Sequence, residues 1–277
     1  MIIISQKVFD KNIYILLIFP AKKRKYTVKK ILCFGDVSDK YKNAIETAMQ
    51  QCADIAGWEP APEIDELPNT SDEFILMKCD IHSDDFLRRI IAINKKLNEG
   101  QKFYLTHCAV FFDKTKKRPP FILTDAACIP MPDETQLTHI VQNAVALFTK
   151  IFGNERTPFI SLISAGGDTN TKLSPVLHPW CAAHINEFPK GTLRIEQLDV
   201  ALDNNIRSEK HLGGHTADII VVDNINTGNA IFKSLSVLSD NWEPLCFLMG
   251  GKNTILLNSR GATKQTLTDN ILLACKN

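Results

Sequence analysis

The sequence predicts an α/β fold in three layers, with helices on both faces of a mostly parallel sheet. Short β-branched and aromatic runs alternate along the chain with amphipathic segments of helical periodicity, and such alternation implies crossover connections between parallel strands. Apolar residues make up 44% of the 277 residues and charged residues 23%. That composition is typical of a globular chain, and the length allows a sizeable core.

The first half of the chain is expected to form strand 28–34, helix 39–55, loop 57–71, strand 73–77, helix 83–97, and strands 103–112 and 120–124. Strands are assigned from short β-branched or aromatic runs, and helices from apolar residues that recur every three or four positions. The loop is rich in Pro, Glu and Asp. Ser83 and the two aspartates after it mark a helix start.

The second half is expected to form helix 133–153, strand 159–163, helix 180–186, strands 193–198 and 218–222, helix 228–238, strands 245–249 and 254–257, and helix 264–275. The helix after Asp133 has the clearest pattern, because Gln136 stands at the capping-box position and Gly153 ends it. In such folds ligands bind beyond the carboxyl ends of the strands. The residues that follow each strand are therefore the candidate site.

Charge and cysteine usage narrow the class of protein. Lys and Arg number 32 and Asp and Glu 31, so the chain lacks the basic excess of a nucleic-acid binder. None of the eight cysteines forms a C-x-x-C pair, and several lie in apolar runs, which predicts a reduced cytoplasmic protein. Residues 1–25 are expected to be an extension, because the apolar run 13–19 is shorter than the about 20 residues that span a bilayer. A membrane or targeting role is the alternative.

Four strand-to-helix junctions carry polar or glycine-rich groups, at residues 78–83, 164–167, 223–229 and 258–261. Each junction by itself reads as a capped turn. Together they offer Lys, Ser, Asn and Arg side chains beside backbone N–H groups at helix N-termini, a combination that binds anions. The residues therefore predict a phosphate or carboxylate ligand at the edge of the sheet.

Other motifs are absent or incomplete. The chain has no G-x-G-x-x-G and no G-x-S-x-G, so it lacks the nicotinamide fingerprint and the hydrolase elbow. Residues 250–254 resemble a P-loop, but Asn253 stands where Ser or Thr binds magnesium, which favours a simple turn. Two glycines separate His211 from His215 and disfavour a helical zinc pair. His139 is interpreted as a packing or polar-face residue.

Five segments match one family's motifs in order and at suitable spacing. They are 76–82 ("LMKG"), 104–111 ("LSHVAVF"), 123–130 ("LTDAAxNxxP"), 140–145 with 160–164 ("IxxNAVxxA…VAxLSA"), and 217–235 with 257–260 ("ADILLVPxxxxGNxxxKxL" and "LTSRA"). From about residue 75 to 275 the chain thus resembles the phosphate acyltransferases, the family of phosphate acetyltransferase and phosphate butyryltransferase. The butyryltransferase branch is the more similar one.

The resemblance implies two α/β/α lobes of the isocitrate/isopropylmalate dehydrogenase type, with the site in the cleft between them. Residues 26–131 and 253–277 are expected to form the first lobe and 132–252 the second. The implied reaction moves a short-chain acyl group between CoA and inorganic phosphate. It needs no metal and no cofactor, since CoA is a substrate, and the family usually forms homodimers.

The resemblance also assigns roles to the junction residues. Arg260 is expected to hold the phosphate through its planar guanidinium and to stabilise the charge of the leaving group. Ser259 is expected to donate to the carbonyl or to a phosphate oxygen. The CoA thiol must lose its proton before it attacks the acyl carbonyl. The remaining substrate-binding residues are Lys78 and His82 from the first lobe and Ser164, Gly166, Gly228, Asn229 and Lys233 from the second.

Several positions depart from the family pattern. Cys79 replaces the glycine of "LMKG", and Val200 and Ala201 replace a Gly-Pro turn. The position of the acid that is thought to act as base in the acetyl enzymes is Thr266, with Asp269 one turn further, so the base is unassigned. These departures leave a second hypothesis, a relative that binds CoA or an acyl phosphate without turnover. Dehydrogenase chemistry on the same fold is a distant third, because the acidic cluster and cofactor glycines are missing.

Overall fold

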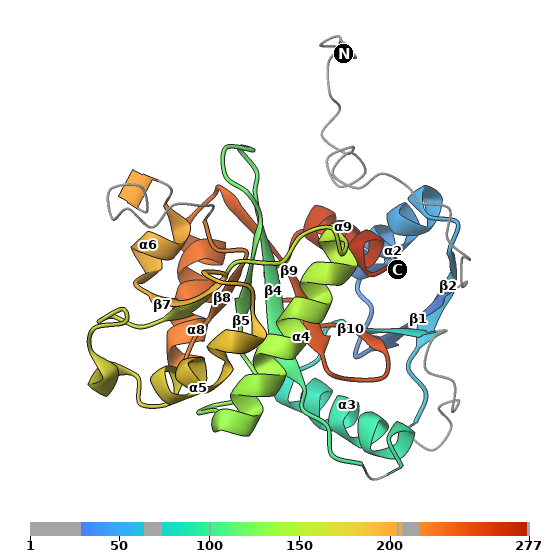
Figure 1. Cartoon of the computed structure of the whole chain (residues 1–277). Helices are drawn as coiled ribbons and strands as arrows, with labels where there is room; N and C mark the ends of the chain where they lie inside the picture. Colours follow the sequence, from blue (N-terminus) through green and yellow to red (C-terminus); the bar gives the residue numbers. More distant parts are fainter. Residues whose placement is uncertain (1–28, 64–73, 100, 204, 207–215, 276–277) are drawn as a thin grey trace.

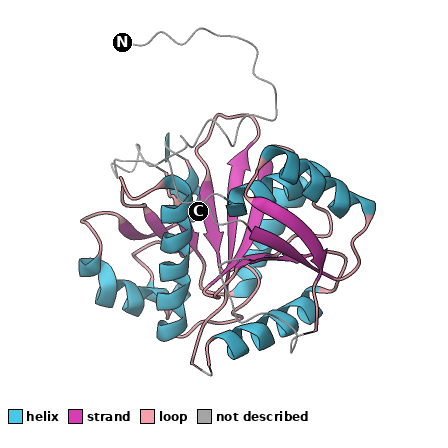
Figure 2. Cartoon of the chain, turned by 90° about the vertical axis from the view of Figure 1, so that its right-hand side faces the viewer, coloured by secondary structure: helices cyan, strands magenta, loops and turns pink. Residues whose placement is uncertain are grey.

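The computed structural model describes residues 29–63, 74–99, 101–203, 205–206 and 216–275. These residues form one central sheet with helices on both of its faces (Figures 1 and 2). The strand order is β2-β1-β3-β10-β9-β4-β5-β8-β6-β7. The two-lobed α/β/α architecture in three layers that the sequence predicts is confirmed.

The strands are β1 (Lys29–Phe34), β2 (Ile55–Pro60), β3 (Phe74–Lys78), β4 (Thr106–Asp113), β5 (Phe121–Thr124), β6 (Ile160–Ile163), β7 (Leu193–Glu196), β8 (Ile219–Val221), β9 (Trp242–Met249) and β10 (Thr254–Leu256). The helices are α2 (Asp39–Gln51), α3 (Ser83–Leu97), α4 (Glu134–Phe152), α5 (Leu177–His184), α6 (Leu198–Leu202), α8 (Ile225–Lys233) and α9 (Lys264–Cys275). A π-helical turn, Ser234–Leu238, continues α8.

The sheet has two parallel halves that run in opposite directions. Strands β2, β1, β3 and β10 are parallel to one another, and so are β5, β8, β6 and β7. The antiparallel pairs β10–β9, β9–β4 and β4–β5 join the halves. The two lobes therefore share one hydrogen-bonded sheet. Their expected residue boundaries stay a prediction, and the expected extension 1–25 lies outside the described residues.

Alternation along the strands divides the core between the two faces of the sheet. In β1, Cys33 faces the largest apolar cluster, which α2, α4, α5 and α9 cover, whereas Phe34 faces a cluster under α3. In β4, Val110 belongs to the first of these clusters and Phe111 to a third, which α8 and α6 cover. Side chains of successive strand residues point to opposite faces, so β1 and β4 are buried on both sides.

The capping signals predicted from the sequence are confirmed at α4. The Asp133 side chain accepts the backbone N–H of Gln136, whose side chain accepts the N–H of Asp133, and Gly153 follows the last residue of the helix. The predicted bounds of α3 and α9 are also correct. The expected cap at Ser83 is wrong by one residue: His82 has the extended backbone of an N-cap residue and its carbonyl accepts the N–H of Phe86.

The sequence assigned residues 55–60 wrongly. They form β2, an edge strand, where the end of a helix and a loop were expected. In β2, Trp58 lies opposite Ile31 of the parallel strand β1. Pairing with a strand that lies far away in the sequence overrides a weak local pattern.

Smaller boundaries also differ from the prediction, and α8 begins at Ile225, three residues earlier than expected. Residues 103–105 precede β4 instead of belonging to it. β9 begins at Trp242, which pairs with Asp113 of β4, and α5 begins at Leu177. Residues 198–202, which local pattern did not assign to a helix, form α6. The start of β9 is thus set by its pairing with β4, a strand from another part of the chain.

The P-loop-like segment is a turn, as expected. Residues 250–253 connect the antiparallel strands β9 and β10. Gly250 has φ +90°, and a Cβ atom there would lie 2.0 Å from the carbonyl oxygen of Tyr104. Only glycine fits at this position.

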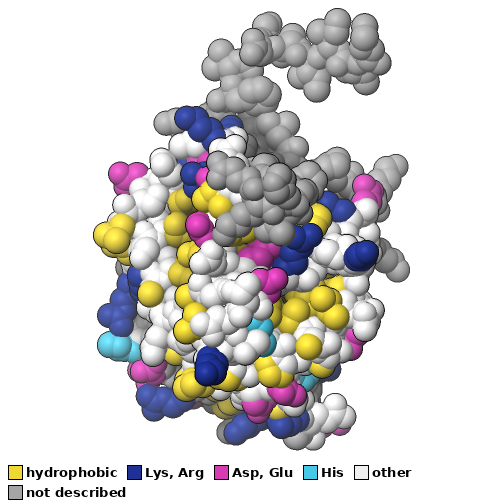
Figure 3. All heavy atoms as spheres, turned by 60° about the vertical axis from the view of Figure 1, so that its left-hand side comes forward, with side chains coloured by type: hydrophobic (Ala, Val, Ile, Leu, Met, Phe, Trp, Pro, Cys, Tyr) yellow, Lys and Arg dark blue, Asp and Glu magenta, His cyan; other side chains and the backbone are white. Residues whose placement is uncertain are grey.

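The described surface carries charges of both signs. On the face in Figure 3, basic and acidic side chains alternate with apolar ones, as expected from a net charge of +1. Among the described helices, none is long and apolar enough to cross a bilayer.

Candidate active site

Two strands from opposite halves of the sheet end at the same level. Leu256, the last residue of β10, pairs with Phe247 of β9, which pairs with Cys108 of β4. The Cys108 thiol in turn lies 3.7 Å from the hydroxyl of Thr124, the last residue of β5. Three strand spacings of about 4.8 Å place the two ends about 14 Å apart. Because β10 and β5 run in opposite directions, this register sets the spacing of their ends, and only the contacts of the loops that follow can bring them into one site.

The first part of the site is a group of cationic and imidazole side chains after β3 and β10. The guanidinium of Arg260 donates a hydrogen bond of 2.8 Å to Nδ1 of His82, the residue before α3. From α2, Lys40 donates to the carbonyl oxygen of Arg260 at 2.9 Å. Lys78 is fully buried at the end of β3. Three of the predicted site residues, Lys78, His82 and Arg260, are thus brought together.

Lys78 is a buried cation that lies close to another cation. Its Nζ reaches the carbonyl oxygen of Cys79 at 3.4 Å, a long hydrogen bond. Burial lowers the pKa of Lys78, and the charge of Arg260 lowers it further, while Asp80 opposes both effects. A bound anion would relieve the desolvation and the repulsion together.

A network of two asparagines holds the loop that carries Ser259 and Arg260. Asn258 is buried, and its side chain donates to the Lys78 carbonyl at 3.2 Å. The side-chain oxygen of Asn258 accepts a hydrogen bond of 2.9 Å from the side-chain amide of Asn270, which lies on α9. Ser259 is half-buried and accepts the N–H of Gly261 at 3.4 Å. The loop is therefore connected to β3 and α9 at its base, whereas the guanidinium of Arg260 is exposed.

The second part of the site is the N-terminal half of α8. Asn224 caps this helix by accepting the N–H of Thr227. Asn229 is exposed and donates to the carbonyl oxygen of Ala126 at 3.3 Å. A Cβ atom on Gly228 would lie 2.6 Å from the carbonyl oxygen of Asp125. Glycine thus lets α8 touch the loop that follows β5.

That loop is organised by Asp125, a residue that sequence reasoning did not include in the site. Its buried carboxylate accepts the backbone N–H groups of Ala127, Cys128 and Ile129 at 2.9–3.2 Å. Burial raises the pKa of Asp125 to about 6, against the effect of these hydrogen bonds. The "LTDAA" motif was the available signal, because it placed an aspartate at the end of a buried strand.

Lys233, at the end of α8, is exposed and lies near a buried histidine. The ring of His107 packs edge-on against Phe232, with centroids 5.6 Å apart, and its Nδ1 is buried without a hydrogen-bond partner. Burial lowers the pKa of His107 to about 4, and the charge of Lys233 contributes. His107 is therefore neutral in the folded protein at pH 7.

Ser164 and Gly166 follow β6. The hydroxyl of Ser164 is buried and has no hydrogen-bond partner among the described residues. A Cβ atom on Gly166 would lie 2.6 Å from Cβ of Asn170, which shows a tight turn. Because β6 and β8 are parallel neighbours and β8 leads into α8, this turn lies at the same edge of the sheet as the start of α8.

The contacts within the described residues connect the two parts through residues 125–129. Ala126 accepts the amide of Asn229, whereas Ala127 and Cys128 pack against the apolar cluster that contains Leu257. Leu257 lies three residues before Arg260. A single pocket that holds both Asn229 and Arg260 stays a prediction, which these contacts of residues 125–129 support.

The positions that depart from the family pattern are buried. Cys79 is fully buried beside Cys33 in the largest cluster. Val200 and Ala201 are buried in α6, so a short helix occupies the place of the Gly-Pro turn. The rest of that motif is only partly described, and His211 and His215 lie outside the described residues.

Asp269 lies near a second acidic residue, Glu243. Burial and the neighbouring Glu243 carboxylate raise its pKa to about 6. Gln265 donates to Asp269 at 2.9 Å, and Thr266 donates to Glu243 at 2.6 Å. Within the part of the chain that the structure describes, no three His, Cys, Asp or Glu side chains are grouped to hold a metal ion.

The chain matches the family model described as "Phosphate acetyl/butaryl transferase" over residues 81–275, more than half of its length. It is 28% identical over 218 residues to a phosphate butyryltransferase of Clostridium acetobutylicum, covering 76% of this chain and 70% of the relative. It is 26% identical over 200 residues to a phosphate acetyltransferase of Rhizobium meliloti, covering 69% of this chain and 61% of the relative. The second match thus spans less than two thirds of the relative.

Solved structures agree on the fold. A branched-chain phosphotransacylase from Enterococcus faecalis superposes with a TM-score of 0.71 at 21% identity, covering 90% of this chain and 98% of the other. A phosphotransacetylase from Streptococcus pyogenes gives a TM-score of 0.65 at 12% identity, covering 90% and 93%. With the family match, the conclusion is that this chain is an enzyme and belongs to the family of phosphate acetyl- and butyryltransferases.

Proposed function

We propose that the protein transfers a short-chain acyl group between CoA and inorganic phosphate, by direct attack and without a metal ion. The observation that carries this proposal is the fully buried ammonium of Lys78 close to Arg260. Two cations at the ends of neighbouring strands form a site for a doubly charged anion. Phosphate is such an anion, and the family relatives in the comparison are phosphate acyltransferases.

In the acyl-phosphate-forming direction, a phosphate oxygen attacks the thioester carbonyl, the C–S bond breaks, and CoA leaves as a thiolate that takes up a proton. In the reverse direction the thiolate attacks and phosphate leaves. Arg260 stabilises the charge on phosphate through two parallel hydrogen bonds, and Ser259 donates to the carbonyl oxygen or to phosphate. Asp269 is the candidate base, since a pKa of about 6 suits proton transfer near neutral pH.

The other predicted binding residues complete the proposed pocket. His82 holds the Arg260 guanidinium in position through a hydrogen bond. The buried ammonium of Lys78 adds positive charge to the proposed phosphate site. Asn229 offers its amide from the opposite wall, at the point where Gly228 lets α8 approach the Asp125 loop. Ser164, Gly166 and Lys233 extend that wall. A cytoplasmic location fits the eight free cysteines, and a homodimer is proposed from the family resemblance.

The test is Arg260→Ala, assayed by free-thiol release from butyryl-CoA with phosphate and EDTA in the buffer. Turnover should fall about 10²–10³-fold, the effect of losing one group that stabilises a transition-state oxyanion. The matched control is Arg88→Ala, because Arg88 lies exposed on α3, where it pairs with Asp85. This variant should turn over as the wild type does.

Two outcomes would contradict the proposal. An unchanged rate for Arg260→Ala would remove Arg260 from the mechanism. No thiol release by the wild type from any acyl-CoA, together with CoA binding in calorimetry, would favour the alternative function of binding CoA or an acyl phosphate without turnover. The buried Cys79, Val200 and Ala201, where the family has glycine or Gly-Pro, are the observations behind that alternative.

A further inference from the structure

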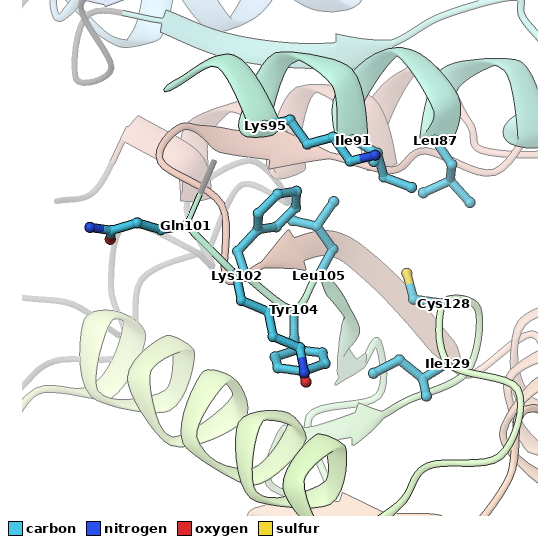
Figure 4. Close-up of a pocket in the computed structure, with 10 residues that line it drawn as sticks. Leu87, Ile91, Lys95, Gln101, Lys102, Tyr104, Leu105, Cys128 and Ile129 are labelled. Atoms are coloured by element: carbon cyan, nitrogen blue, oxygen red, sulfur yellow. The ribbon is translucent and has the colours of Figure 1, made fainter. Parts of the chain in front are cut away.

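A cavity of about 540 Å³ lies between α3 and the segment that precedes β4. Figure 4 shows Leu87 and Ile91 of α3 on one side and Leu105, Cys128 and Ile129 on the other. Most of these side chains are hydrocarbon, and the Cys128 thiol behaves as a small apolar group when buried. The volume lies in the range of about 300–1,000 Å³ that is typical of small-molecule sites.

The two charged residues that line the cavity are lysines. Lys95 and Lys102 are exposed, and the ammonium of Lys102 lies 5.0 Å from the centre of the Tyr104 ring. In such positions the aliphatic stem of lysine extends the apolar wall while its charge stays in water. In Figure 4 the Lys95 side chain runs toward Ile91 and the Lys102 ammonium lies beside Tyr104. The cavity is thus an apolar channel whose two lysines are exposed.

The inner end of the cavity is part of the candidate site. Cys128 and Ile129 line this end, and their backbone N–H groups donate hydrogen bonds to the Asp125 carboxylate. The carbonyl oxygen of Ala126, in the same loop, accepts the amide of Asn229. Leu87, Leu105 and Cys128 also share an apolar cluster with Leu257, three residues before Arg260. In the proposed pocket, a group that reacts between Asn229 and Arg260 would therefore lie next to this channel.

We propose that the channel holds the acyl chain of the substrate, so that the enzyme prefers hydrocarbon acyl groups of about four to eight carbons over acetyl. This inference rests on the proposed function and names its substrate class. An acetyl group has three heavy atoms and leaves most of 540 Å³ unfilled. Each additional methylene that enters the channel strengthens binding about fourfold. The apolar side chains that line the inner end disfavour hydroxylated or charged acyl groups there.

The test compares acetyl-, butyryl-, hexanoyl- and octanoyl-CoA in thiol release and in calorimetric binding. For the wild type, kcat/KM should rise at least tenfold from acetyl- to hexanoyl-CoA, and octanoyl-CoA should bind at least tenfold more tightly than CoA. The variant Ile91→Trp narrows the channel from α3, where Ile91 is 40% exposed. It should abolish both preferences and leave the affinity for CoA unchanged.

The matched control is Ile185→Trp, since Ile185 is 45% exposed and does not line the cavity. This variant should keep the wild-type preference. Equal kcat/KM for acetyl- and hexanoyl-CoA, or the same fold-change for both in Ile91→Trp, would overturn the inference while the proposed function stands. No turnover, with tighter binding of octanoyl-CoA that Ile91→Trp abolishes, would reject the proposed function and support the channel.

Discussion

Two buried residues with shifted pKa values, His107 and Asp125, occupy neighbouring positions beneath α8. His107 has a pKa of about 4, lowered by burial and by Lys233, and Asp125 has a pKa of about 6, raised by burial. Between pH 6.5 and 4 the unfolded chain protonates this histidine but the folded chain does not, so stability is lost as pH falls. The raised pKa of Asp125 has the opposite effect on stability. As pH falls below about 6, the folded chain takes up a proton at Asp125 before the unfolded chain does, so this residue adds stability.

We expect His107→Gln to reduce the stability lost between pH 7 and pH 5 by about 2 kcal/mol, the part of the shift that develops in that range. Urea unfolding at the two pH values measures it. The control is His184→Gln, because His184 is bonded to the Trp180 carbonyl oxygen and lies far from His107 in the sequence. An equal pH dependence in both variants would show that another group is responsible.

At the scale of elements, the contact between α8 and the loop after β5 decides whether the second part of the site forms. Gly228 makes that contact possible, since a Cβ atom would lie 2.6 Å from the backbone oxygen of Asp125 and 2.9 Å from Cα of Ala126. Both neighbours are backbone atoms in a loop held by three hydrogen bonds to Asp125. A Cβ atom at position 228 would therefore force the loop backbone and the helix apart.

We therefore expect Gly228→Ala to lower the free energy of unfolding by about 1–3 kcal/mol, the usual cost of overpacking. The control is Gly261→Ala, where the nearest heavy atom to a Cβ lies 3.9 Å away, and it should leave stability nearly unchanged. Denaturant unfolding of both variants provides the comparison. Equal stabilities would mean that the loop adapts and that this approach is not tight.

At the scale of the whole molecule, one sheet and one core connect the two lobes. The largest apolar cluster includes Ile31 of β1 and Leu193 of β7, near opposite edges of the sheet. A core that continues through the middle of the sheet should unfold cooperatively. This differs from an enzyme whose lobes are separate domains joined by linkers.

We expect one unfolding transition from both lobes. Variants that retain only Trp58, in β2, or only Trp180, in α5, report on the two ends of the molecule. Their fluorescence midpoints in urea should coincide with each other and with far-UV circular dichroism. Separate midpoints would show that the lobes unfold independently.

Local sequence determined the elements whose signals are complete within one segment. The capping box of Asp133 and Gln136 and the apolar stripe after it predicted α4, and the bounds of α9 were predicted correctly. The motifs that carry the family resemblance also predicted the junction residues of the site. These features need only side-chain periodicity and capping chemistry, which are properties of neighbouring residues.

The tertiary structure alone decided what depends on residues far apart in the chain. β2 exists because β1 lies beside it, and the equal level of Leu256 and Thr124 follows from pairing across β9 and β4. The role of Asp125 and the cavity beside α3 emerge when α3, α8 and the loop after β5 come together. Sequence patterns report local periodicity, whereas burial and strand register are set by partners that the chain meets only on folding.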